Sequence, residues 1–362
     1  MARILLVPDS FKGSASSVEV AQAIMQGWLT ERPADEVLSI AFADGGEGTL
    51  ASIESSVTNA QRIPISVQAA DGVEHQSYWL LVNGNTAVIE MAMLCGISTI
   101  GQLDPLGAHS YGLGQTIKAA FDDDRVNEIL VAVGGSASTD AGVGAMTALG
   151  ANFKDSNGER LSLGGKALLD LRTIEFGSEY LAPTKRIKVL VDVQSPMTGR
   201  EGAAFVFARQ KGASVEEVEL LNRGLENFLA VAQSKDHPGY GAAGGVSGGL
   251  AILLGAEIVS GVATLAEITG VIAQLDATDC VITGEGSFDS QSYSGKVVGY
   301  VLEQAKTRGV DSVVVCGVNK NGDNPKVLSL VELAPSVDAA ITESKHWLEV
   351  AGGIIARRYT QP

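Results

Sequence analysis

The amino-acid sequence predicts an α/β fold in which one α/β domain is inserted into another. The chain has 362 residues, enough for two domains at roughly 150 residues each. Near both ends of the chain, short apolar runs lead into polar or glycine-containing turns and then into helical patterns. Between these two regions, alternating runs separated by hairpin dipeptides replace that pattern.

The first part of the chain predicts two strand and helix pairs. An apolar run at 4–7 ends in Pro8-Asp9-Ser10, and residues 14–29 then place apolar side chains at helical spacing. A second strand at 38–42 leads into a glycine turn, with a helix beginning around Glu47. Strands that alternate with helices along the chain are typical of a parallel sheet.

A different arrangement is expected after residue 58. Three runs with alternating side chains are separated by Asp71-Gly72 and Asn83-Gly84, and they lie at 62–69, 75–82 and 86–92. Such dipeptides favour β-hairpins, so antiparallel strands interrupt the parallel sheet. Further strands, at 128–133 and 188–193, again precede a glycine-rich or polar turn.

The first pattern returns near residue 277. It predicts, in order, a strand in DCVITGEGS, a helix at 294–307, strands at 312–318 and 338–342, and a final helix at 347–359. Two strands before the interruption and three after it form one five-stranded parallel sheet. We therefore expect a discontinuous, flavodoxin-like α/β domain formed by residues 1–58 and 277–362, with residues 59–276 as the inserted α/β domain.

Composition excludes several classes of protein. The 42 acidic and 26 basic residues give a net charge of −16 without a basic run, which disfavours nucleic acid and anionic membranes as partners. No apolar stretch reaches the ~18 residues needed to span a membrane. Cys95, Cys280 and Cys316 lie in apolar stretches without metal-ligand spacing, so we expect free, buried thiols and a cytoplasmic protein.

Polar turns after the predicted strands are the candidate binding sites, because ligands of open α/β sheets lie at the carboxyl ends of strands. Three turns carry glycines, hydroxyls and charges suited to a phosphate or carboxylate; their candidate residues are Asp9, Ser10 and Lys12, then Gly45, Gly46 and Glu47, and then Gly134, Gly135, Ser136 and Asp140. Simpler explanations stay open for each turn. Ser14 or Ser16 could cap the first helix, Glu47 could complement a helix dipole, and the third turn could be tight without holding a ligand.

Further charged residues follow later strands. Asp192, Glu285 and Asp289 are candidates for holding Mg²⁺ or for accepting a proton from a hydroxyl, although each could instead satisfy loop N–H groups. Lys211 and Lys296 lie beside small residues and could bind an anion, or could be solvated surface charges. Carboxylates and lysines in glycine-rich turns, without a zinc motif or serine triad, favour phosphoryl transfer.

One glycine motif is set aside. The GxGxxG pattern at 239–244 follows KDHP rather than a strand, so it is not a dinucleotide fingerprint. Its small residues could let a loop and a helix pack closely, or could let a nucleotide lie against the backbone. Without the strand-linked fingerprint, a nicotinamide-dependent dehydrogenase is disfavoured.

Seven motifs follow one another along the chain: PDSFKGS, FADGGEGT, VGGSASTDAGVGAMTALGA, DVQSPMTGREGAA, RQKGA, PGYGAAGG and TGEGSFDSQSYSGK. In this order and spacing they resemble the glycerate kinase family of bacterial type, which phosphorylates D-glycerate with ATP. The resemblance implies a two-domain α/β kinase, ATP and Mg²⁺ as cosubstrates, and 2- or 3-phosphoglycerate as product. It also implies that Lys12, Lys211 and Lys296 bind phosphate or the glycerate carboxylate, and that Asp192, Glu285 and Asp289 are metal or base candidates, with Asp192 and Asp289 as the metal ligands.

Three positions depart from the family pattern. Thr139 and Ser195 stand where the family usually has asparagine, and Ser287 stands where it has arginine. A serine cannot replace the bidentate contact of an arginine to a carboxylate or phosphate. An alternative therefore stays open, a catalytically impaired relative that binds a nucleotide or small acid as a regulatory protein. A homodimer is a further expectation.

Overall fold

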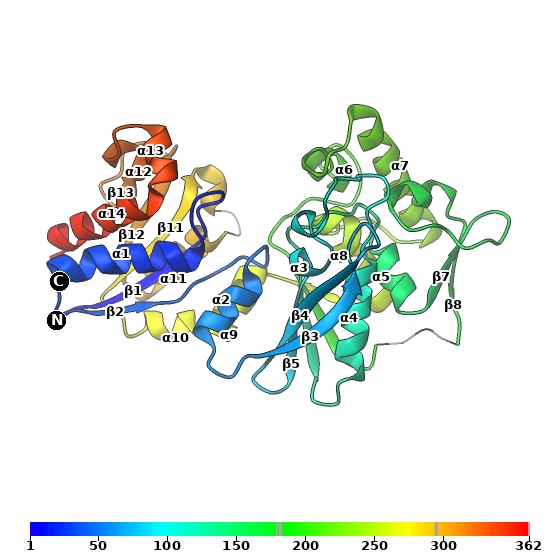
Figure 1. Ribbon diagram of the computed structural model, residues 1–362, viewed down its shortest axis with the longest axis horizontal. Coiled ribbons are helices and arrows are strands. Elements are labelled where there is room, and N and C mark those ends of the chain that lie inside the picture. Colours follow the sequence, from blue (N-terminus) through cyan, green and yellow to red (C-terminus); the bar gives the residue numbers. More distant parts are fainter. Residues whose placement is uncertain (179, 181–182, 294–295, 361–362) are drawn as a thin grey trace. The chain divides into compact units, whose positions relative to one another are not determined.

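The structure, a computed structural model, describes residues 1–178, 180, 183–293 and 296–360 (Figure 1). The chain forms two compact units. Unit 1 consists of Met1–Asp44, Ala51–Thr58 and Val262–Pro362, and unit 2 of Gly45–Leu50 and Asn59–Gly261. The return to unit 1 thus comes before the expected residue 277, because helix α10 (Val271–Leu275) packs against strand β1 (Arg3–Pro8) of unit 1.

Unit 1 is built on a five-stranded parallel sheet. Its strand order is β13-β12-β11-β1-β2, with β2 at Glu36–Ser39, β11 at Cys280–Phe288, β12 at Asp311–Asn319 and β13 at Val327–Ser329. Counted along unit 1 alone, this is the order 2-1-3-4-5 of flavodoxin-like sheets. The predicted α/β class and its flavodoxin-like parallel sheet are confirmed.

Helices α1 (Ser17–Glu31) and α14 (Ser344–Arg358) lie side by side in unit 1 (Figure 1). Helix α1 begins with a capping box between Ser16 and Glu19, so Ser16 is the cap. A Cβ at Gly27 would lie 1.8 Å from the carbonyl oxygen of Glu349, so the two backbones meet where this glycine stands. Other helices with residues in unit 1 are α2 (Thr49–Ser56), α9 (Gly261–Thr269), α11 (Val297–Arg308), α12 (Leu330–Leu333) and α13 (Val337–Thr342), besides the 3₁₀ turn η5 (Ser290–Tyr293).

The predicted fifth strand was wrong. Residues 338–342 lie in helix α13, whose N-cap Ser336 accepts a hydrogen bond from the Ala339 backbone N–H. The fifth strand is instead β13, which is only three residues long and pairs with β12. The helix predicted from residue 294 is α11; residues 294–295 lie outside the described residues, and α11 begins at Val297.

Unit 2 is built on a mixed sheet of order β10-β9-β6-β5-β4-β3. Its strands are β3 (Gln61–Gln68), β4 (Glu74–Val82), β5 (Thr86–Glu90), β6 (Glu128–Ala132), β9 (Arg186–Leu190) and β10 (Glu257–Val259). Strands β3, β4 and β5 pair antiparallel, as the hairpin dipeptides predicted, and the others pair parallel. Asn83 and Gly84 both have positive φ, 53° and 75°, which the tight turn between β4 and β5 requires.

Helices surround this sheet, and unit 2 also contains a small, separate second sheet. The helices are α3 (Ala92–Cys95), α4 (Tyr111–Asp122), α5 (Val143–Ala148), α6 (Ala203–Phe207), α7 (Val215–Val231) and α8 (Val246–Leu254), with 3₁₀ turns η1 (Ile97–Thr99), η2 (Gly165–Asp170), η3 (Arg209–Lys211) and η4 (Ala242–Gly245). Strands β7 (Ala151–Lys154) and β8 (Thr173–Phe176) form the second sheet. No helix in the described ranges is long and apolar enough to cross a membrane.

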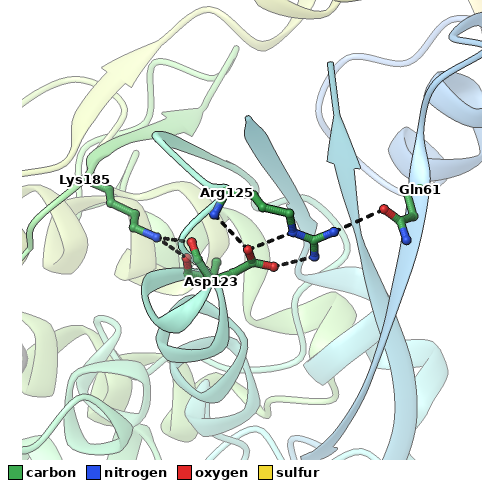
Figure 2. A network of polar contacts seen from close by, with 5 residues as sticks. Gln61, Asp123, Arg125 and Lys185 are labelled. Atoms are coloured by element: carbon green, nitrogen blue, oxygen red, sulfur yellow. Dashed lines mark hydrogen bonds and ion pairs between the residues drawn. The ribbon is translucent and has the colours of Figure 1, made fainter. Parts of the chain in front are cut away.

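A polar network ties the sheet of unit 2 together at the end where β6 and β9 begin (Figure 2). The Asp123 carboxylate pairs with Arg125, whose guanidinium also donates to Gln61 at the start of β3. Lys185, just before β9, donates to the carbonyl oxygens of Ala120 and Asp123. The side-chain bond to Arg125 is the main reason that the pKa of Asp123 falls to about 2. This network lies away from the strand ends that carry the candidate residues.

The glycine motif at 239–244 is a packing element. A Cβ at Gly241 would lie 2.1 Å from the carbonyl oxygen of Pro196, and one at Gly244 would lie 2.2 Å from that of Ser138. These glycines let a loop approach two other segments of unit 2 closely. The three cysteines are free and buried, as expected.

Candidate active site

In unit 1, the candidate residues gather at the carboxyl ends of β1 and β11. The chain leaves β1 toward β2 on one side and later places β11 on its other side, so strand order reverses between β1 and β11. Ligands of open α/β sheets bind at such a point. Pro8 is opposite Gly284, so Asp9, the first residue after β1, comes next to Glu285, which lies within the last part of β11. The backbone N–H of Asp9 also donates to the Gly284 carbonyl at 2.8 Å.

The environment of Asp9 opposes its ionisation. Burial, followed by the negative charge of Asp44, raises the pKa of Asp9 to about 6, and Glu285 adds a smaller effect in the same direction. The backbone N–H of Ser10, which donates at 2.6 Å, and the charge of Lys12 act the other way. A carboxyl with a pKa near 6 changes its protonation close to neutral pH, which is typical of functional sites.

Glu285 is a second buried carboxyl with an unusual environment. It is 6% exposed, and burial is the main cause that raises its pKa. Lys296 approaches one carboxylate oxygen, with Nζ 3.7 Å from Oε2. The other oxygen, Oε1, is buried and has no hydrogen-bond partner within the part of the chain that the structure describes. A buried carboxylate oxygen without a partner points to a missing cation or donor.

Mg²⁺ fits this position. No group of three or more His, Cys, Asp or Glu side chains that could hold a metal occurs among the described residues. Mg²⁺ does not require one, since it is commonly held by one or two carboxylates together with waters and substrate phosphates. The unpartnered Oε1 of Glu285 is an oxygen ligand of the kind that Mg²⁺ prefers.

The remaining candidates of unit 1 surround these carboxyls. Lys12 is exposed in the loop between β1 and α1, and Lys296 is the N-cap residue of α11. Asp289 shapes the turn before α11, because its backbone N–H donates to Ser292 Oγ at 2.9 Å and its Oδ1 accepts from the Gln291 N–H at 2.9 Å. Lys296 provides a positive charge, and the N-terminus of α11 provides the positive end of a helix dipole; both favour a bound anion.

In unit 2, two glycine turns touch each other. A Cβ at Gly134 would lie 2.4 Å from the Cα of Gly46, and the Gly134 N–H donates to the Gly45 carbonyl. Gly135 has a φ of +73°, where a side chain would be strained. The glycines therefore let the two turns approach each other closely.

Glu90 holds the first of these turns and was missed by the sequence analysis. Its buried carboxylate accepts hydrogen bonds from the backbone N–H groups of Gly48 and Leu50, each at 2.9 Å. Burial is the first cause that raises the pKa of Glu90, and exposed Glu47 adds its charge in the same direction. The position of Glu90 at the carboxyl end of β5 was the signal that could have identified it.

The second turn is held from inside by Asp140 and Lys211. Asp140 is fully buried and accepts hydrogen bonds from the backbone and hydroxyl of Ser110 at 2.8 Å each and from the N–H groups of Gly142 and Gly144. These bonds occupy its oxygens within unit 2. Ser110 was another residue that the sequence analysis did not identify.

Lys211 is 3% exposed, and its ammonium donates to Ser136 Oγ at 2.9 Å and to the Ser138 carbonyl at 2.5 Å. Burial lowers the pKa of Lys211 to about 8, while the charge of Asp140 opposes that shift. The hydroxyls of Ser138 and Thr139 are also buried, and neither has a partner within the described ranges. Lys211 therefore sets the conformation of a turn that contains two unsatisfied hydroxyls.

Asp192 follows β9 and lies next to the start of α9. Its Oδ1 accepts hydrogen bonds from Ser260 Oγ at 2.8 Å and from the Gly261 N–H at 3.1 Å. A Cβ at Gly45 would lie 3.1 Å from the Cβ of Leu190, so the first glycine turn packs against the strand that leads to Asp192. The carboxylate thus contacts the beginning of a helix, where the dipole favours negative charge.

The structure therefore distributes the predicted residues over two groups. Unit 1 brings together Asp9, Ser10, Lys12, Glu285, Asp289 and Lys296, and unit 2 contains Gly45, Gly46, Glu47, Gly134, Gly135, Ser136, Asp140, Asp192 and Lys211. At the carboxyl ends of parallel strands, Asp9 follows β1 in unit 1, and Gly134 and Asp192 follow β6 and β9 in unit 2. Such positions suit the binding of anions and the transfer of a charged group.

Comparison with known proteins agrees with this arrangement. The sequence profile of the glycerate kinase family matches residues 4–360. The chain belongs to the glycerate kinase family. Glycerate 2-kinase of Escherichia coli (strain K12) is 36% identical over 315 residues, which cover 84% of this chain and 82% of that protein. Glycerate kinase of Bacillus subtilis (strain 168) is 34% identical over 325 residues, covering 87% of this chain and 85% of that protein.

A solved relative extends the glycerate kinase assignment to the fold. A crystal structure assigned as glycerate kinase 2 of Salmonella typhimurium LT2 matches with a TM-score of 0.81 at 31% identity, covering 99% of this chain and 98% of that chain. The family resemblance inferred from the seven motifs is confirmed.

Proposed function

We propose that this protein transfers the γ-phosphoryl group of ATP to D-glycerate. The observation that carries the proposal is the family match over residues 4–360, with every candidate carboxylate and lysine retained in the motifs. The proposed product is 2-phosphoglycerate, supported by the relative of Escherichia coli that is a glycerate 2-kinase. The free, buried thiols support the cytoplasm as compartment, and a homodimer remains our expectation.

The reaction forms a bond between a glycerate oxygen and the γ-phosphorus while the bond from that phosphorus to ADP breaks. The hydroxyl proton leaves to a carboxylate, for which Asp192, Glu285 and Asp289 are the candidates. Mg²⁺ bound with ATP would neutralise phosphate charge. In unit 1 we propose Glu285 Oε1 and Asp289 as its oxygen ligands, and in unit 2 Asp192 is a separate candidate ligand. Glu285 must be ionised to act either as a base or as a metal ligand. A bound cation must therefore offset the effect of burial, which raises the pKa of Glu285.

The lysines and turns have separate proposed roles. Lys12 and Lys296, which are accessible in unit 1, bind the glycerate carboxylate or a phosphate, with Asp9 and Ser10 beside them. In unit 2, the turns with Gly45, Gly46 and Glu47 and with Gly134, Gly135 and Ser136 bind the nucleotide. Lys211 is buried, so we propose that it acts on its ligand through the Ser136–Ser138 segment, where it is already bonded.

Release of ADP from MgATP by the purified protein, with and without D-glycerate, tests the activity. Glycerate-dependent release is the expected result, and ³¹P NMR of the product identifies the phosphorylated carbon. Failure to release ADP at saturating glycerate, by a protein that binds ATP, would contradict the proposal. Asp192→Asn should lower turnover by orders of magnitude in a folded protein, whereas exposed Asp124→Asn should not; near-normal turnover of Asp192→Asn would remove it from the mechanism.

A further inference from the structure

Unit 2 contains a cavity that the proposed reaction does not use. Its volume is about 410 Å³, and it is bounded by α4, α5, β7 and residues 160–162. Its lining is mixed: polar groups predominate, and the half-buried side chains of Tyr111 and Leu161 add apolar surface. This volume is within the range of small-molecule sites, and the mixed lining suits a molecule that has both a polar group and an apolar part.

The charge of the cavity is opposite to that of the protein. The chain has a net charge of −16, yet the residues that line the cavity include Lys118 and Arg160 and no aspartate or glutamate. Arg160 is exposed, and its guanidinium has no ion pair or hydrogen bond within the described part of the chain. Lys118 pairs with Asp122 at 3.0 Å, but both side chains are largely exposed, 46% and 61%, so this pair is weak.

The position of these cations defines the ligand further. Thr147, Ala148 and Leu149, at the carboxyl end of α5, also line the cavity, and that end of a helix disfavours negative charge. An anionic group is therefore expected beside Arg160 and Lys118, with the uncharged part of the molecule against α5. A bare inorganic anion would contact Arg160 and Lys118 but would leave the lining next to α5 without a partner.

The cavity shares its two helices with the turn that Asp140 organises. Helix α4 begins directly after Ser110, which donates two hydrogen bonds to Asp140, and the Gly144 N–H of α5 donates to the same carboxylate. The helices also touch, because a Cβ at Gly114 would lie 2.1 Å from the Ala145 carbonyl oxygen. The cavity is therefore bordered by the same two helices that fix the second glycine turn through Asp140.

We propose that this cavity is an effector site for a small organic molecule that has a phosphate or carboxylate group on an apolar body. Its occupancy shifts the position of α4 relative to α5 and so changes the affinity or turnover at the second glycine turn. The expected change in affinity or turnover rests on the proposed kinase activity, whereas binding of the molecule to the cavity is independent of that activity.

Isothermal titration calorimetry with phenyl phosphate on the full chain tests the binding. We expect millimolar or tighter binding that persists with saturating MgADP and D-glycerate, and that weakens at least about tenfold in Arg160→Ala, which loses a charge-assisted contact. Arg223→Ala, which removes an exposed arginine of α7 outside the cavity, should bind as the unmodified protein does. Inorganic phosphate should bind more weakly than phenyl phosphate.

Several results would overturn the proposal. They are absence of binding, equal binding by Arg160→Ala, and loss of binding when MgADP and glycerate saturate the protein, which would assign the probe to the nucleotide site. Ala148→Phe, which fills the cavity without changing its charge, should abolish binding while circular dichroism shows a folded chain. The kinetic role has its own test: phenyl phosphate should change kcat or KM in the unmodified protein but not in Arg160→Ala.

Binding without any kinetic change would refute the effector role. If the protein had no kinase activity, the calorimetric result alone would decide whether the cavity binds the molecule.

Discussion

Replacing Asp9 by asparagine is expected to stabilise the protein at alkaline pH while it impairs the proposed activity. Burial and the charge of Asp44 raise the pKa of Asp9 from 3.8 to about 6. The folded chain therefore binds this proton more tightly than the unfolded chain does, and folding loses stability as pH rises from about 4 to about 6. At about 1.4 kcal/mol per pKa unit, the penalty of ionised Asp9 above pH 6 is roughly 3 kcal/mol.

Asparagine removes this penalty and keeps an oxygen that accepts from the Ser10 N–H. Urea denaturation at pH 8, followed by tryptophan fluorescence that includes buried Trp28 of unit 1, should show Asp9→Asn to be more stable by up to about 3 kcal/mol. At pH 5 the gain should be about half as large, because Asp9 is then mostly protonated in the folded chain. The same gain at both pH values, or a loss at pH 8, would refute the assigned cause. Exposed Asp124→Asn provides the control.

Three substitutions in unit 2 give further predictions. Glu90→Gln places an amide donor against one of two backbone N–H groups and should lower the free energy of unfolding by about 1–3 kcal/mol in denaturant titrations, whereas exposed Glu201→Gln should change it little. Lys211→Met loses the hydrogen bonds that hold the Ser136–Ser138 segment, so turnover should fall about tenfold or more. It also removes a costly buried charge, so Tm should change little, and a large drop in Tm would indicate a purely structural role. Gly134→Ala brings a Cβ within 2.4 Å of the Gly46 Cα, so the turns must separate and the KM for ATP should rise, and an unchanged KM would exclude these turns from nucleotide binding.

The sequence was sufficient for most of the fold because hydrophobic periodicity is local. The hairpins at Asp71-Gly72 and Asn83-Gly84 and the strands at 4–7 and 312–318 follow from residues within a few positions of each other. The fifth strand was mistaken because residues 338–342 are apolar enough for a strand, while the cap at Ser336 determines a helix. A three-residue strand such as β13 depends on its pairing with β12, which periodicity does not reveal.

The candidate-site residues that could be predicted are those that follow a strand closely in the sequence. Asp9 and Glu285 were found because the carboxyl ends of parallel strands meet at one edge. Glu90 and Ser110 were missed because their partners are 40 or 42 and 30 residues distant in the chain. Asp140 was a candidate in a turn suited to a phosphate or carboxylate. The structure shows its oxygens bonded to four groups inside unit 2, a placement that depends on how distant elements pack.

The discontinuity of unit 1 determines the order in which the chain can fold during synthesis. Strand β1 pairs with β11, and the Thr283 hydroxyl donates to the Val7 carbonyl across 276 residues of sequence. The ribosome must therefore synthesise all of unit 2, which ends at Gly261, before β11 can pair with β1, and until then that edge of β1 stays unpaired. Unit 2 is expected to fold first, and its folding brings the two ends of unit 1 within reach of each other. Contacts so distant in sequence predict slow completion of unit 1, and nascent chains stalled before residue 280 should be the ones that aggregate or recruit chaperones.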